Sequence, residues 1–94
     1  MYIKDITRNS RINSLKAVVK ELSPIKKFQR MGDPGKLLMV VLEDETGIAN
    51  LALWDDQVDT VKKGDEVLLE NCKVKEYRGE LQISISNGSI KVIK

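Results

Sequence analysis

Residues 36–54, KLLMVVLEDETGIANLALW, decide the fold. Residues 36–43, which include six consecutive apolar residues, predict a β-strand with every second side chain, at Leu38, Val40 and Leu42, on one face. Asp-Glu-Thr-Gly at 44–47 predicts a tight turn, and a second strand follows over residues 48–54. We therefore expect these two strands to form a hairpin.

The next ten residues, DDQVDTVKKG at 55–64, break this period of two. Acidic residues come first, lysines come last, and Gly64 follows them, which is the charge order that complements a helix dipole. The segment predicts a short helix. Such a helix is too short to be stable alone, so it must pack on the sheet.

Three further strands are expected outside this unit. A long strand over residues 15–28 bends near its proline, and a turn at 31–35 joins it to the hairpin. Residues 66–77 predict another strand, whose inward side changes near Asn71, and residues 80–86 predict the last. The inward residues of these two strands are expected to be Val67, Leu69, Cys72, Val74, Leu81, Ile83 and Ile85.

The order of elements is therefore three strands, a short helix and two strands in 94 residues. This order predicts an all-β OB-fold, a five-stranded Greek-key barrel with a short helix between strands 3 and 4. An SH3-like barrel is the nearest alternative, but it does not predict a helical turn at that point. We expect residues 1–94 to form a single domain, alone or within a larger protein, with residues 1–12 covering one end of the barrel.

The composition argues against an enzyme. The chain has no His and a single Cys, which excludes Cys/His zinc sites, disulfide frameworks and His-based acid/base catalysis. Turn and helix-cap roles account for the acidic residues at 43–45 and 55–56, so no metal and no cofactor is expected. The sequence has neither an apolar stretch of about 20 residues nor a signal peptide, which predicts an intracellular, cytoplasmic and nucleoid-associated protein without a membrane partner.

The net charge of +2 conceals an uneven distribution. Residues 1–42 hold nine basic and three acidic side chains, residues 43–70 hold two and nine, and residues 71–94 hold five and two. The ends of the chain are basic and the middle is acidic. If the two ends fold onto one face, the protein carries a positive strip suited to an anionic partner.

Strand alternation places candidate binding residues on that strip. Asn50, Ala52 and Trp54 are expected to point outward from one strand, and Lys73, Lys75 and Tyr77 from another. Aromatic rings among cations suit single-stranded nucleic acid, because bases stack on the rings while the cations contact phosphates. The candidate DNA-binding residues are Trp54, Tyr77, Lys26, Lys27, Phe28, Arg30, Lys36, Lys73, Lys75, Arg78, Gln82 and Ser84.

Each candidate also has a purely structural interpretation. Trp54 would cap the barrel end or pack against the helix, Tyr77 would support a turn, and Phe28 would pack at a strand end. The lysines would form a solvated face, and Cys72 would be a small core residue. Exposure and contacts in the structure distinguish the two interpretations.

Several blocks resemble, in order and spacing, the OB domains of archaeal replication protein A and the related simple single-stranded DNA-binding proteins. They are residues 23–30, 43–47, 53–56, 64–67 and 77–82, within a similarity that runs from about Ile3 to Lys91. The Asp-Glu-Thr-Gly turn followed seven residues later by Trp-Asp-Asp is the most specific block. The resemblance implies binding of single-stranded DNA in replication, repair and recombination, without catalysis.

The resemblance also implies roles for particular residues. Trp54 and Tyr77 match positions where the family stacks bases, and Lys26, Lys27 and Arg30 match its phosphate-contacting segment. Lys73 stands where some relatives carry another aromatic, which shifts weight toward electrostatic binding.

Two alternatives to DNA binding stay open. The acidic middle of the chain suits a protein-interaction or assembly domain of a larger replication factor, with other replication-protein subunits or domains as partners. Stacking does not distinguish ribose from deoxyribose, so an RNA-binding OB domain of the tRNA-anticodon type is the other alternative.

Overall fold

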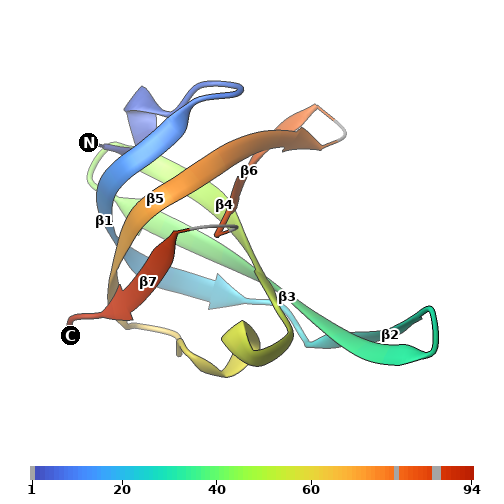
Figure 1. Cartoon of the computed structure of the whole chain (residues 1–94). Helices are drawn as coiled ribbons and strands as arrows, with labels where there is room; N and C mark the ends of the chain where they lie inside the picture. Colours follow the sequence, from blue (N-terminus) through green and yellow to red (C-terminus); the bar gives the residue numbers. More distant parts are fainter. Residues whose placement is uncertain (1, 78, 86–87) are drawn as a thin grey trace.

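Five strands of the described chain close into a barrel (Figure 1). They are β1 (Arg11–Leu22), β3 (Asp33–Asp44), β4 (Gly47–Trp54), β5 (Glu66–Tyr77) and β6 (Glu80–Ser84). Their order is β1, β3, β4, β6, β5 and back to β1, and the pairing of β4 with β6 is parallel while the others are antiparallel. The predicted five-stranded barrel is confirmed.

The computed structural model describes residues 2–77, 79–85 and 88–94, without the side chains of Arg30, Asp56 and Tyr77.

Two short strands extend this barrel. β2 (Lys26–Arg30) forms a hairpin with β3 that projects away from the barrel in Figure 1. β7 (Ser89–Val92) lies along β5, where it pairs with the stretch from Val67 to Glu70. The sequence analysis did not predict β7, because its four alternating residues, Ser-Ile-Lys-Val, are too few to distinguish a strand from a loop.

The barrel interior holds the apolar side chains that the period of two selects. Leu38, Val40 and Leu42 of β3 are at most 3% exposed, and the core also includes Leu15, Ala17, Val19, Leu51, Leu53, Val67, Leu69, Cys72, Val74, Ile83 and Ile85. The burial of Cys72 confirms its core role, and this burial raises the pKa of its thiol. Leu81 is a correction, because this predicted inward residue is 37% exposed.

The helix predicted over residues 55–64 is wrong in type and length. The structure has one 3-10 turn, η2 (Asp55–Asp59), which ends where the amide of Thr60 donates to the carbonyl of Gln57. Val58 and Val61 are buried in the core. The chain then turns at Lys63 and Gly64, where the amide of Asp65 donates to the carbonyl of Lys62 and the amide of Gly64 donates to the carbonyl of Val19. This turn leads into β5, so the helix does not continue. None of the helices in the described ranges is long and apolar enough to cross a membrane.

The bounds of other predicted strands also differ from those in the structure. The strand predicted over 15–28 is two strands, because the chain leaves the sheet at Ser23 and Pro24 before β2 begins. The predicted turn at 31–35 contracts to Met31 and Gly32, since the next three residues pair with β2. β6 ends at Ser84, and Ser86, the last residue of the predicted strand, lies outside the described residues.

The predicted change of inward side near Asn71 is confirmed. Asn71 has a φ of 57°, in the left-handed region, and both Leu69 before it and Cys72 after it are fully buried. β1 changes its inward side at the facing residues Ile12 and Leu15, so the register between the two strands is continuous. The consequence for function is that Lys73 and Lys75 face outward.

The N-terminal segment lies against one end of the barrel. It forms the 3-10 turn η1 (Ile3–Asp5), in which Ile3 is buried in the core. The amide of Ile3 donates to Oδ2 of Asp44 at 2.8 Å, while the amide and hydroxyl of Thr46 donate to Oδ1 of the same carboxylate. Asp44 therefore joins the start of the chain to the β3–β4 turn.

Candidate nucleic-acid interface

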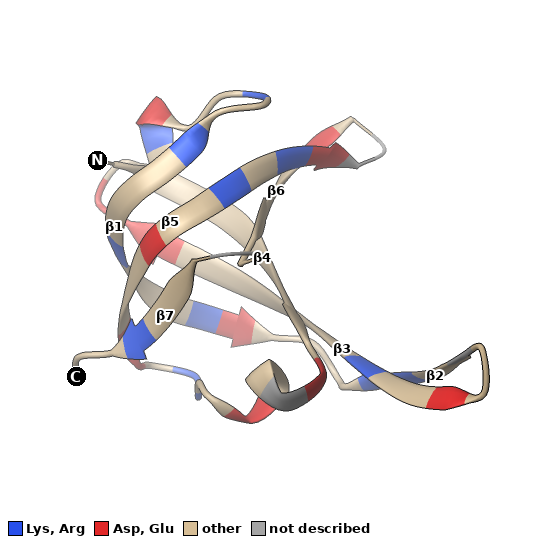
Figure 2. Ribbon diagram, viewed as in Figure 1, with Lys and Arg blue, Asp and Glu red and all other residues tan. Residues whose placement is uncertain are grey.

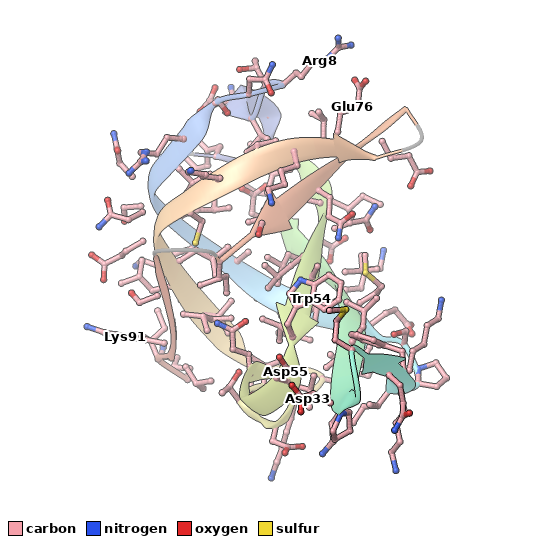
Figure 3. All side chains as sticks on the ribbon, turned by 45° about the vertical axis from the view of Figure 1, so that its right-hand side comes forward. Arg8, Asp33, Trp54, Asp55, Glu76 and Lys91 are labelled. Atoms are coloured by element: carbon pink, nitrogen blue, oxygen red, sulfur yellow. The ribbon has the colours of Figure 1, made fainter. Side chains whose placement is uncertain are left out.

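Trp54 ends β4 and remains 40% exposed. Its indole contacts the ring of half-buried Phe28 in a T-shaped arrangement, with centroids 5.9 Å apart and planes at 86°. This contact limits the movement of the indole without covering it, because an edge-to-face pair leaves ring surface available. In Figure 3 Trp54 lies between the barrel and the β2–β3 hairpin.

The β2–β3 hairpin is fixed beside Trp54 by a second contact. Oδ1 of Asp55, the residue after Trp54, accepts a hydrogen bond from the amide of Lys36 at 3.1 Å. Lys26 and Lys27 are exposed on the hairpin, and Lys27 pairs with Lys36 across it. The predicted basic residues of this region therefore line an arm next to the indole.

A groove of about 200 Å³ runs beside Trp54. It is lined by Ala52, Trp54, Lys75, Glu76, Gln82 and Ser84. Strand pairing explains this set, because Ser84 lies between Ala52 of β4 and Lys73 of β5, and Gln82 pairs with Lys75. The structure thus brings together four predicted residues that lie on three different strands.

Ala52 is a correction to the predicted solvent-facing row. It shares the outward side of β4 with Trp54, yet it is only 1% exposed and lies in the groove. Met39, which pairs with Ala52, accepts a weak hydrogen bond at its sulfur from Nε2 of Gln82 at 3.9 Å. The small side chain of Ala52 leaves space above the sheet, and this role could not be deduced from the alternation alone.

Five lysines near the groove have no counter-ion within the part of the chain that the structure describes. Among the described residues, no ion pair involves Lys26, Lys27, Lys36, Lys73 or Lys75. Glu76, the acid in the groove, pairs with Arg8 at 2.8 Å. Figure 2 shows basic residues on β5 and on the neighbouring start of β1. The face consequently has positive charge available for an anionic ligand.

Some predicted residues lie outside the groove or outside the described residues. Arg78 lies outside the described residues, as do the side chains of Tyr77 and Arg30, so only the backbone pairing of Tyr77 with Glu80 places that residue near the groove. Lys73 lies in an adjoining hollow. Arg11, which lines that hollow too, was missed by the sequence analysis, because its position beside Lys73 depends on a pairing between distant segments.

The described residues contain no group of three or more His, Cys, Asp or Glu side chains able to hold a metal ion. Asp44, at the β3–β4 turn, accepts backbone hydrogen bonds instead. In particular, burial acts against the ionised form of Asp44, but bonds from Thr46, Ile3 and Gly47 outweigh it and lower the pKa of the carboxyl group.

The barrel and its groove define a class of protein. The model of the OB-fold nucleic acid binding domain, a family named after the tRNA anticodon, matches residues 14–93, and the chain belongs to this family.

Solved structures give a more particular likeness. The chain is similar to the second OB-fold domain of replication protein A from Methanococcus maripaludis, with 33% identity, coverage of 100% of this chain and 96% of that one, and a TM-score of 0.78. A crystal structure of a domain of the same protein gives 32% identity, coverage of 100% and 97%, and a TM-score of 0.80. The predicted resemblance to archaeal replication protein A is confirmed.

A curated relative adds a point about length. An uncharacterized protein of Arabidopsis thaliana is 26% identical over 73 residues, which are 78% of this chain and 48% of the relative. The chain therefore spans about half the length of the curated relative that it matches.

Proposed function

We propose that this OB domain binds single-stranded DNA, without catalysis, in replication, repair or recombination. One observation carries the proposal: Trp54, Lys75, Gln82 and Ser84 line one groove, with Trp54 still exposed. The likeness to domains of replication protein A supports it. Its place of action would be the cytoplasm, at the nucleoid, where single-stranded DNA arises.

Each part of the groove has a task in this proposal. A base stacks on the exposed part of the Trp54 indole, while Gln82 and Ser84 offer hydrogen bonds to base edges or sugar. Lys75, with Lys73 beside it and Lys26, Lys27 and Lys36 on the hairpin, neutralises phosphates. Because stacking accepts every base, the expected binding has little sequence preference.

The first test replaces the ring. Trp54→Ala should weaken binding of an oligo-dT by about 1 to 3 kcal/mol, the usual contribution of one stacked base. Anisotropy of a labelled oligonucleotide measures the affinity, since the variant lacks the indole. In the wild type, DNA should quench Trp54 fluorescence, and log affinity should fall with log salt by about 0.7 per phosphate contacted.

Tyr2→Ala is the matched control for this test. Tyr2 is an aromatic of similar exposure, 47%, that does not line the groove. Its removal should leave the affinity unchanged. Equal affinities for wild type and folded Trp54→Ala would return Trp54 to a structural role, and a wild type that binds no oligo-dT at low salt would refute the proposal.

RNA is the competitor to be tested, because the family takes its name from an RNA element. Matched DNA and RNA oligomers should compete for one site, with DNA preferred. Stronger binding of RNA would replace the proposed ligand while leaving the groove assignment intact.

A further inference from the structure

A second hollow, of about 390 Å³, lies where β1 begins beside β5. It is lined by Asn9, Ser10, Arg11, Lys73, Val74 and Lys75. The amide of Val74 donates to the carbonyl of Ser10 at 3.1 Å, which fixes the segment before β1 to β5. Within that segment Thr7 and Ser10 bond each other through the Ser10 hydroxyl, so the rim of the hollow is ordered.

Two positive charges face each other in this hollow. Arg11 and Lys73 are direct partners in the antiparallel register of β1 and β5, and both are exposed. Like charges in directly opposite positions of a sheet are destabilising. Within the described ranges, no ion pair relieves Arg11, Lys73 or Lys75, and the nearby Glu76 is engaged by Arg8.

The two hollows share one lining residue. Lys75 lines both the groove at Trp54 and the hollow at Arg11. From β4 the surface crosses β6 and β5 to reach β1, which are three strand spacings or roughly 14 Å. A nucleic acid backbone that leaves Trp54 across these strands would therefore meet Lys75, Lys73 and Arg11 in turn.

We infer that the start of β1 and the facing part of β5 form a second phosphate subsite, which rests on the proposed function and extends the bound strand beyond the Trp54 groove. Arg11 and Lys73 bind one phosphate between them, and the negative charge of that phosphate offsets the repulsion between the two cations. The guanidinium of Arg11 offers paired donors that fit phosphate oxygens. Asn9 and Ser10 form the rim against which the nucleotide lies.

The test compares Arg11→Gln with Lys16→Gln. Lys16 is an exposed cation of the same strand that lines a different hollow, with Asp44 and Glu45. On an oligo-dT of about 12 nucleotides, within the range one OB fold covers, Arg11→Gln should weaken binding roughly three-fold at low salt. Its salt slope should shrink by about 0.7. Lys16→Gln should match the wild type.

A dT dinucleotide separates this inference from the proposed function, because it is too short to reach from Trp54 across the roughly 14 Å to β1. Arg11→Gln and wild type should therefore bind it equally and show equal quenching of Trp54. An Arg11→Gln variant that binds the longer oligomer with wild-type affinity and slope overturns the subsite, as does an equal loss on both lengths. Absence of quenching in the wild type overturns the proposed function, and this inference with it.

The free protein gives an independent measurement. Because Arg11 faces Lys73 without a counter-ion, Arg11→Gln should leave the melting temperature unchanged or raise it. A marked fall in melting temperature would assign Arg11 to the fold instead and would contradict a subsite built on unrelieved charge.

Discussion

At the scale of single residues, Gly88 shows how a backbone contact supports the binding face. An added Cβ at this position would lie 2.6 Å from the carbonyl oxygen of Asn71 and also against the carbonyl of Glu70. Real Cβ atoms do not approach backbone oxygen so closely. Gly88 thus lets the chain before β7 approach the left-handed residue Asn71 of β5, after which Lys73 faces outward.

Gly88→Ala should therefore destabilise the protein by about 1 to 3 kcal/mol, the range for overpacking a well-filled site. Urea unfolding measures this change. Ser89→Ala is the control, because that neighbouring side chain is exposed and its removal adds no atom. A Gly88→Ala variant as stable as the control would mean that β7 can shift without cost.

At the scale of elements, the β2–β3 hairpin and β4 are coupled through aromatic rings. The T-shaped contact with Phe28 restrains Trp54, while Lys36 of the hairpin bonds Asp55. An indole already held in place loses less entropy when a base stacks on it, because less freedom remains to be lost.

Phe28→Ala should weaken DNA binding by about 0.5 to 1.5 kcal/mol, the contribution of an aromatic pair. The steady-state anisotropy of Trp54 in the free protein should fall as the indole gains freedom. Gln29→Ala, an exposed change on the same strand, is the control. If binding weakens while the anisotropy stays constant, Phe28 contacts the base itself rather than positioning Trp54.

The elements also show what the sequence could predict. β5 has the predicted bounds, and β4 differs by one residue, because turn-forming residues mark the ends of both strands. η2 is shorter than predicted, since the burial of Val58 and the return of the chain to Val19 override the charge pattern. β7 has a polar/apolar alternation of only four residues, which is too short to predict a strand without its pairing with β5.

The candidate site was likewise predicted in part from the sequence. Alternation within single strands predicted that Trp54 and Lys75 point outward, and this is where the structure places them. Two other features depend on pairings between distant segments: the place of Ala52 in the groove and the place of Arg11 beside Lys73. Local periodicity specifies a side chain's face, whereas its neighbours on that face follow from topology.

At the scale of the whole molecule, the fold brings basic segments from the two ends of the chain together. The basic start of β1 lies against the basic half of β5, while acids of the central segment occupy the β3–β4 turn and η2 (Figure 2). Asp44 of that turn holds the N-terminal segment through the amide of Ile3. Its ionisation consequently links pH to the closure of one end of the barrel.

The sign of this linkage follows from the pKa. Hydrogen bonds lower the pKa of Asp44 in the folded protein, so the carboxylate contributes stability above its unfolded pKa of about 3.9. That contribution is lost as the pH falls through the folded pKa. Asp44→Asn removes the charge and one acceptor, and should cost about 1 kcal/mol near neutral pH, as for loss of a helix cap.

Thermal melts from about pH 6 to about pH 3 measure this effect. The difference in melting temperature between wild type and Asp44→Asn should be largest near neutral pH and shrink as the wild-type carboxyl group becomes protonated. Glu45→Gln, at an exposed neighbouring position, is the control for the loss of an acid from the same turn. A difference that stays constant over this range would show that the charge of Asp44 contributes nothing and that only its shape holds the N-terminal segment to the barrel.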